Sequence, residues 1–319
     1  MTTTTPAPAS RSRPARRKPS LARRRETMAA LGFLSPWIVG FIVFTAGPIF
    51  YSLYLAFTDY DIINEPEFVG TANFQEMMED PRVRRALANT FIFALMKVPL
   101  TMITALALAM LLLRVGRAAG FFRTAFYLPV MTPAVAVGIL FLLLFNGDFG
   151  IVNRVLALVE IDGPNWTTDG PWIKPGLALM SLWALGGTVI IYLAALNDVP
   201  QDMYEAAAID GASPWKQFRH VTLPMISGAL FFTFIIQTIA AFQSFDEAYT
   251  AFFGNRATAA FSSDAALFYV IYLFQQAFQF FHMGYASALA WLLFVIIMII
   301  TAIQVRLSSR FVYYEGETR

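Results

Sequence analysis

The sequence predicts an all-α membrane protein with six transmembrane helices. Of its 319 residues, 57% are hydrophobic and 14% are charged, a balance far from that of a soluble domain. Six apolar runs are long enough to cross about 30 Å of hydrocarbon, for which a helix needs about 20 residues. Among these runs, the second alone contains a formally charged residue, Lys97.

The predicted spans are separated by polar segments of unequal length. They cover Ala29–Phe57, Asn89–Leu113, Thr124–Asn146, Pro175–Leu196, Met225–Phe245 and Met283–Val305. We expect bends at Pro36 and Pro48 in the first and at Pro129 and Pro133 in the third, because proline removes a helical hydrogen bond. The apolar stretch Ala265–Phe281 has 17 residues, three of them glutamine. We interpret it as an external amphipathic or re-entrant segment packed on the bundle, rather than as a seventh span.

The distribution of Lys and Arg predicts the orientation. With the N-terminus inside, the inner segments hold 16 of the 23 basic residues and the outer segments hold 6. Because cytoplasmic segments are enriched in Lys and Arg, we expect both termini to lie in the cytoplasm of a cell-membrane protein. Residues 1–28 read as a disordered basic tail, 29–307 as the membrane domain and 308–319 as a second tail. The first tail has no aromatic residue to stack on bases, so nucleic-acid binding is not expected.

A polar loop separates the fourth and fifth predicted spans and reads as two short helices. We expect Asp198 to cap the first helix, with Pro200 in its first turn. Gly211 should end it, because glycine adopts the left-handed conformation without a side-chain clash. Ser213-Pro214 should begin the second helix in the same way.

Other features of this loop, which covers residues 197–224, point to a protein partner. Leu223-Pro224 is expected to close the second helix before the fifth span. Small alanines at 206–208 leave the first helix thin, so that it can enter a groove on another protein. The alternative is a helix pair lying on lipid, which would be rich in basic residues. The loop has four carboxylates against Lys216 and Arg219, which favours the protein partner.

The spacing of Glu205-Ala206-Ala207, Gly211 and Leu223-Pro224 resembles the cytoplasmic loop signature of permease subunits of binding-protein-dependent ABC importers. The shorter stretches Leu34-Ser35-Pro36-Trp37 and Phe57-Thr58-Asp59-Tyr60 are similar to the carbohydrate branch, which includes maltose, lactose and glycerol-phosphate permeases. The resemblance covers most of the chain between its two tails.

This resemblance implies the type I ABC importer permease fold and a set of partners. These are a second related permease, two cytoplasmic ATPases and an extracytoplasmic solute-binding protein that delivers a sugar or sugar-like solute. The residues implied to contact the ATPase are Glu205, Ala206, Ala207, Gly211, Leu223 and Pro224. The chain contains no phosphate-binding Gly-Lys loop, so ATP and Mg²⁺ are expected on the partner ATPase and no cofactor on this chain.

Polar and aromatic side chains inside the spans are candidates for the solute pathway, because such groups are costly in a membrane unless they face a cavity or another helix. The candidates are Thr233, Gln237, Gln243, Ser244, Trp183, Tyr192 and Ser287. For each of them, a hydrogen bond between helices or simple packing is the alternative. Lys97 is expected to reach the outer interface, and Asp246 and Glu247 to be solvated near the outer surface.

Two other classes of function remain as alternatives. An ion-coupled secondary transporter needs coupling groups near the midplane, but no carboxylate lies near the middle of any predicted span. A membrane-embedded enzyme is disfavoured because the chain has no cysteine and only two histidines, too few for a metal cluster or a paired catalytic constellation. We therefore expect no catalytic residue and no metal site, and the identity of the solute stays open.

Overall fold

The computed structural model describes residues 21–253 and 264–311. It divides into two compact units, Met1–Tyr54 and Leu55–Arg319. The first contains α1 (Leu21–Phe41), the π-helical turn η1 (Ile42–Ala46) and most of α2 (Gly47–Leu55). Together, Met28–Leu55 form a helix long and apolar enough to cross a membrane, as predicted.

The second unit begins with a small hairpin and the long helix α4. Strands β1 (Thr58–Asp59) and β2 (Glu67–Phe68) pair antiparallel, and α3 (Ala72–Glu79) follows them. Helix α4 (Pro81–Arg114) has 34 residues and starts well before the predicted Asn89. The reason is a strong local start signal: Asp80 accepts a hydrogen bond from the Arg82 amide at 2.8 Å, and Pro81 fits the first turn.

The third and fourth predicted spans are bent pairs of helices. After the turn η2 (Gly116–Ala118), the first pair consists of α5 (Ala119–Tyr127) with η3 (Leu128–Met131) and then α6 (Ala134–Leu144), with a bend of 99°. The second is α8 (Gly170–Met180), η4 (Ser181–Ala184) and α9 (Gly186–Asn197), with a bend of 59°. Helix α7 (Ile151–Ala157) lies between the two pairs in the chain. Pro133 explains the first bend, since it supplies no amide hydrogen at the start of α6.

The remaining helices complete the bundle. They are α10 (Gln201–Ile209), α11 (Pro214–Gln217), η5 (Phe218–Thr222), α12 (Leu223–Met225), α13 (Ser227–Phe242), α14 (Asp246–Phe252), α16 (Tyr269–Phe274), η6 (Gln275–Gln279) and α17 (Met283–Phe311). Within the described residues, four helices are long and apolar enough to span a membrane, or up to six if each bent pair is one span. The stretch 265–281 forms the short α16 and η6, which pack on α4 and α17 and are not among these spans.

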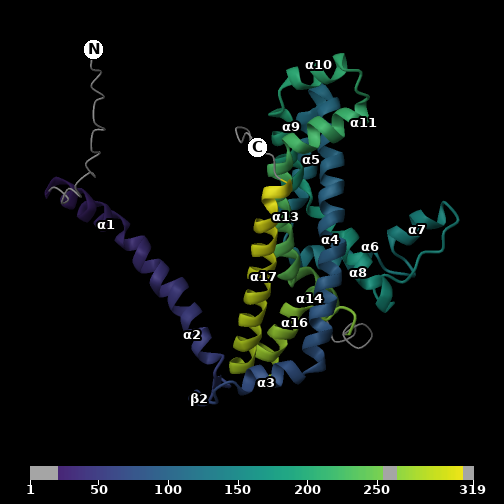
Figure 1. Cartoon of the computed structure of the whole chain (residues 1–319). Helices are drawn as coiled ribbons and strands as arrows, with labels where there is room; N and C mark the ends of the chain where they lie inside the picture. Colours follow the sequence, from purple (N-terminus) through teal and green to yellow (C-terminus); the bar gives the residue numbers. More distant parts are fainter. Residues whose placement is uncertain (1–20, 254–263, 312–319) are drawn as a thin grey trace, which may run out of the picture. The chain divides into compact units, whose positions relative to one another are not determined.

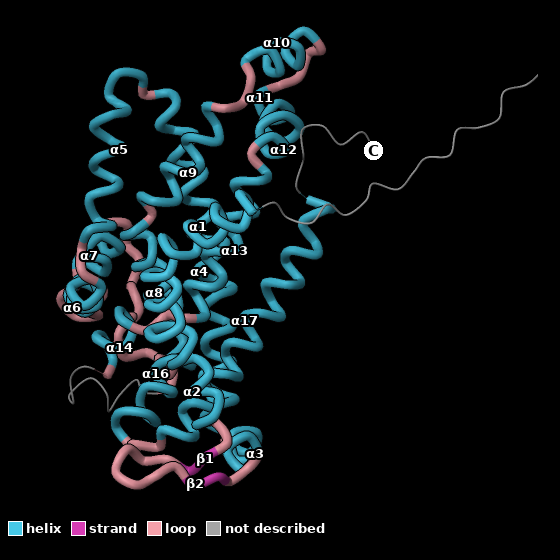
Figure 2. The backbone as a smooth tube through the Cα atoms, turned by 90° about the vertical axis from the view of Figure 1, so that its left-hand side faces the viewer, coloured by secondary structure: helices cyan, strands magenta, loops and turns pink. Residues whose placement is uncertain are grey.

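The two ends of the second unit are named here by the helices that lie at them. Helices α10 and α11 lie at one end, called the α10 end, and α3 and α16 lie toward the opposite end, called the α3 end (Figures 1 and 2). Two apolar clusters fill the unit between them. One surrounds Phe141 and Tyr269, and the other, nearer the α10 end, surrounds Tyr192 and Leu193.

Candidate functional site

The first helix of the polar loop starts two residues later than the sequence suggests, at Gln201. Asp198 does not cap α10; it has helical backbone angles and ends α9. The residue preceding α10 is Pro200, and no side chain caps the first amides of the helix. The prediction for Asp198 is therefore wrong, because as the C-cap of α9 it keeps the helical backbone angles that an N-cap residue must leave.

Gly211 ends α10 as predicted. Its φ is +74°, in the left-handed region. The Gly211 amide donates to the Ala208 carbonyl at 3.0 Å, and the Ala212 amide donates to the Ala207 carbonyl at 2.9 Å. These two bonds form a Schellman motif that satisfies carbonyls at the helix end. A Cβ at Gly211 would meet no atom within 4 Å, so the requirement for glycine comes from the backbone.

The second helix of the loop begins as expected and ends differently. The Ser213 hydroxyl accepts a hydrogen bond from the Lys216 amide at 3.4 Å, with Pro214 in the first turn. The prediction that Leu223-Pro224 closes this helix is wrong, because helical turns continue through both residues to Met225. The π-helical turn η5 explains this: the Leu223 amide donates to the Phe218 carbonyl, and Pro224 falls in the first turn of α12.

Helix α10 is anchored along one side and open along the other. The Tyr204 and Thr222 hydroxyls are 3.0 Å apart, and Ala207 packs on the apolar cluster around Tyr192. Ile209 is 87% exposed and Trp215 is 67% exposed. Two large apolar side chains are thus exposed on this polar loop. Of the implied ATPase-contacting residues, Glu205, Ala206 and Gly211 are exposed, whereas Ala207, Leu223 and Pro224 are part-buried.

A cavity of about 280 Å³ lies where the two bent pairs break. Thr132, between η3 and α6, lines it, as do Ser181 and Trp183 of η4. Its other lining residues are Phe93, Lys97, Thr101, Pro129, Val130, Ala134, Val137, Leu177, Met180, Ala184, Gln237, Ser244, Glu247, Ala248 and Phe268. Irregular backbone at membrane depth is tolerated where it is buried in protein or lines a cavity, which fits both breaks.

The structure brings three of the predicted pathway residues together in this cavity: Gln237, Ser244 and Trp183. The Gln237 amide also donates to the Thr188 hydroxyl at 3.0 Å. The other four candidates lie outside the lining. The hydroxyls of Tyr192 and Thr233 hydrogen-bond each other at 2.6 Å, Gln243 is exposed, and Ser287 is part-buried on α17.

Two charged residues in the lining were assigned elsewhere from the sequence. Lys97 was expected at the outer interface, but it lies halfway along α4, because this helix starts at Pro81. Its ammonium lies 5.5 Å from the centroid of the Phe93 ring. Glu247, expected near the outer surface, lines the same cavity from α14 and is part-buried. The signal for Lys97 was present, since no other predicted span position carries a formal charge.

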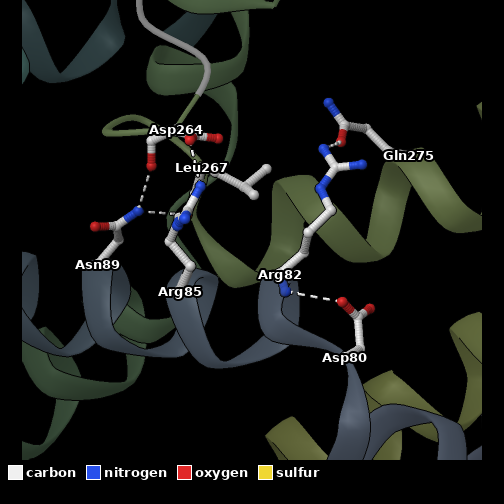
Figure 3. Close-up of polar contacts among 7 residues, drawn as sticks. All are labelled: Asp80, Arg82, Arg85, Asn89, Asp264, Leu267 and Gln275. Atoms are coloured by element: carbon white, nitrogen blue, oxygen red, sulfur yellow. Dashed lines mark hydrogen bonds and ion pairs between the residues drawn. The ribbon is translucent and has the colours of Figure 1, made fainter.

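Next to this cavity, the segment leading into α16 is fixed to α4 by polar contacts (Figure 3). The Asn89 amide donates to the Asp264 carbonyl at 2.8 Å and to the Leu267 carbonyl at 3.1 Å. The Lys174 ammonium donates to the Asn89 amide oxygen at 3.1 Å, and Arg85 forms an ion pair with Asp264. This segment ends at Phe268, so these contacts position one wall of the cavity.

Asp80 joins three helices at the α3 end. Its carboxylate accepts hydrogen bonds from the Tyr272 hydroxyl and, at 2.9 Å, from the Tyr285 hydroxyl. Burial raises the pKa of the Asp80 carboxyl, but the bonds from Tyr272, the Arg82 amide and Tyr285 outweigh it and leave that pKa below its usual value. Burial, together with the bonded Asp80 carboxylate, raises the pKa of Tyr272 to about 12. At neutral pH the Asp80 carboxyl therefore stays ionised and the Tyr272 hydroxyl stays protonated, as their hydrogen bond requires.

Residues 97–313 match the model of the family described as binding-protein-dependent transport system inner membrane component. The chain belongs to this family. It is therefore a multi-pass membrane component of a transport system, and the ion-coupled alternative is not supported. The matched region contains the whole polar loop 197–224, called the α10 loop from here on, and every cavity residue except Phe93.

Individual relatives agree with this assignment. A probable ABC transporter permease protein, YesP of Bacillus subtilis, is 38% identical over 303 residues, covering 94% of this chain and 96% of the relative. The lactose transport system permease protein LacF of Rhizobium radiobacter is 34% identical over 278 residues, covering 85% and 91%. The arabinooligosaccharides transport system permease protein AraP of Bacillus subtilis is 28% identical over 285 residues, covering 88% of each chain.

The fold also has a solved counterpart. A chain in the crystal structure of a bacterial alginate ABC transporter, in complex with an alginate pentasaccharide-bound periplasmic protein, superimposes with a TM-score of 0.77. The two chains are 21% identical, and the match covers 90% of this chain and 96% of the other. The predicted type I importer permease fold is thereby confirmed.

Proposed function

We propose that this protein forms the translocation pathway of an ATP-driven importer for a sugar or sugar-like solute delivered by an extracytoplasmic binding protein. The observation that carries the proposal is the family match, which includes both the α10 loop and the cavity. The named sugars of the lactose and arabinooligosaccharide relatives support the solute class. Hydroxyl, amide and aromatic groups in the cavity suit a solute with many hydroxyl groups.

The proposal includes partners on both sides of the membrane. A second related permease pairs with this chain, and two ATPases bind ATP and Mg²⁺ and dock on the α10 loop. The termini and the α10 end then face the cytoplasm, in agreement with the distribution of basic residues. The exposed Glu205, Ile209 and Trp215 of this loop support the docking surface. Hydrolysis of ATP is assigned to the partner, and this chain is not an enzyme.

The contacts of α10 provide a route from the docking surface to the cavity. The Tyr204–Thr222 contact joins α10 to η5, and η5 continues through α12 to the start of α13. Helix α13 carries Gln237, which lines the cavity. ATP binds the closed arrangement of the two ATPases more tightly than the open one. Closure of the docked ATPases therefore shifts the population of permease conformations through these helices.

A pull-down from mild detergent tests the partners. Ala206 is exposed on α10 and has no bulk, so Ala206→Trp blocks a closely approaching partner without replacing a buried group. We expect the tagged wild-type chain to co-purify an ATPase and a second permease. The Ala206→Trp chain is expected to lose the ATPase and to keep the second permease. The matched control is Ala157→Trp on α7, also exposed and outside the loop. An ATPase absent from the wild-type complex, or one that stays bound to Ala206→Trp, contradicts the proposal.

Gln237→Leu is expected to lower solute uptake at least several-fold. The change removes an amide from the cavity and its bond to Thr188, and it leaves the α10 loop unaltered. Uptake of the solute that co-purifies with the binding protein is measured in proteoliposomes, alongside basal ATP hydrolysis, which should not change. Thr233→Val serves as the control, since it removes a hydroxyl from the same helix outside the cavity. Equal uptake by Gln237→Leu and wild type assigns Gln237 to packing alone.

A further inference from the structure

Two opposite charges, those of Lys97 and Glu247, face the cavity. Among the described residues, neither the Lys97 ammonium nor the Glu247 carboxylate forms a hydrogen bond or an ion pair. The ion pair within the described part of the chain joins Arg85 and Asp264, which do not line the cavity. The Lys97 ammonium has the Phe93 ring as its neighbour. An intramembrane charge is costly, so an ionisable residue kept at this depth points to function.

The two charges come from different walls and remain within electrostatic range of each other. Lys97 belongs to α4, and Glu247 belongs to α14, whose backbone packs closely on α6 at Gly138. The cavity between them also presents the Ser181 hydroxyl and the Gln237 amide. At about 280 Å³ it is near the lower limit of ligand pockets, which begin at about 300 Å³, so it has room for one small unit.

Resting on the proposed transport of a sugar, we propose that Lys97 and Glu247 hold a neutral polyhydroxylated solute between them and select against sugars with a net charge. An ammonium only donates hydrogen bonds and a carboxylate only accepts them, whereas a hydroxyl does both. A neutral sugar therefore satisfies both residues at once. A sugar acid meets the Glu247 carboxylate, and an amino sugar meets the Lys97 ammonium, each with like-charge repulsion.

The charge of the cavity can be measured without knowing the solute. The chain contains no cysteine, so Ser181→Cys places a single thiol in the cavity wall. The probes are a cationic and an anionic methanethiosulfonate reagent, applied to the full importer complex in nanodiscs, with labelling of this chain followed by mass spectrometry. In this background, Lys97→Met should raise the cationic-to-anionic rate ratio about tenfold, and Glu247→Gln should lower it about tenfold.

Matched variants separate this effect from a general change in charge. Arg154→Met removes a positive charge from exposed α7, and Asp246→Asn removes a negative charge beside Glu247 outside the lining. Both should leave the rate ratio within about twofold of the parent. A ratio that is unaltered by Lys97→Met and Glu247→Gln, in complexes that elute like the parent, overturns the proposal.

Protection of the same thiol by millimolar solutes tests the selectivity. Glucose should slow labelling of the parent more than glucuronate or glucosamine does. Lys97→Met should shift the preference toward glucosamine, and Glu247→Gln toward glucuronate. Stronger protection of the parent by either charged sugar overturns the proposed selectivity. Protection by alanine but by none of the three sugars overturns the sugar function instead, even where the rate ratios confirm the two charges.

Discussion

Gly211→Val is expected to abolish ATP-driven uptake, with at least a tenfold loss, while the chain still inserts in the membrane. Gly211 has a φ of +74°, and a β-branched residue in the left-handed region costs about 1–3 kcal/mol. The helix end then abandons its bonds to the Ala207 and Ala208 carbonyls, and α10 no longer presents Glu205 in one orientation. Uptake and solute-stimulated ATP hydrolysis by the reconstituted complex measure the loss.

Two controls isolate the backbone conformation as the cause. Gly211→Asn should retain most of the uptake, because asparagine tolerates the left-handed region better than other residues. Gly228→Val places the same side chain on α13, at a position where φ is not positive and an added Cβ would meet no atom within 4 Å. This variant should transport normally. Normal uptake by Gly211→Val would show that coupling does not depend on this turn.

Asn89→Leu is expected to give the largest loss of stability. The side chain donates to the Asp264 and Leu267 carbonyls and accepts from Lys174, so its removal leaves several groups without their bonds. Each buried unpaired group costs about 1–3 kcal/mol, and we expect a loss of about 3 kcal/mol with a fall in Tm of roughly 5–10 °C. Thermal unfolding followed by tryptophan fluorescence in nanodiscs measures it.

A second substitution on α4 provides the contrast. The Thr101 hydroxyl is buried and has no hydrogen-bond partner among the described residues. Thr101→Val keeps the shape of the side chain and removes an unpaired group, so the Tm should stay constant or rise. If Asn89→Leu and Thr101→Val unfold at the same temperature, the contacts of Asn89 do not fix the segment before α16.

Local signals in the sequence predicted local structure well. Gly211 and Ser213 were correctly placed at a helix end and a helix start, because each depends on a few adjacent residues. Asp198 and Leu223-Pro224 carry equally good local signals, but Asp198 ends α9 with helical backbone angles, and helical turns continue through Leu223-Pro224. A cap or a proline is a preference of about 1–3 kcal/mol, which packing of the flanking helix or a π-helical turn can override.

Pathway residues were predicted with mixed results for a related reason. Gln237, Ser244 and Trp183 line the cavity, whereas Tyr192 and Thr233 use their hydroxyl groups on each other. A polar residue inside a span needs a hydrogen-bond partner, but the amino-acid sequence does not say whether that partner is a solute or another helix. That distinction depends on which helices are neighbours.

The sequence by itself determined the all-α membrane fold, the family resemblance and the chemistry of the α10 loop, since composition, run length and residue spacing are properties of the chain. Only the tertiary structure decided that the breaks in two spans meet beside α4 and form a cavity. It also decided that Lys97 and Glu247, 150 positions apart, face that cavity. Hydrophobic periodicity specifies which residues avoid water, but the packing of bent helices specifies which polar residues meet.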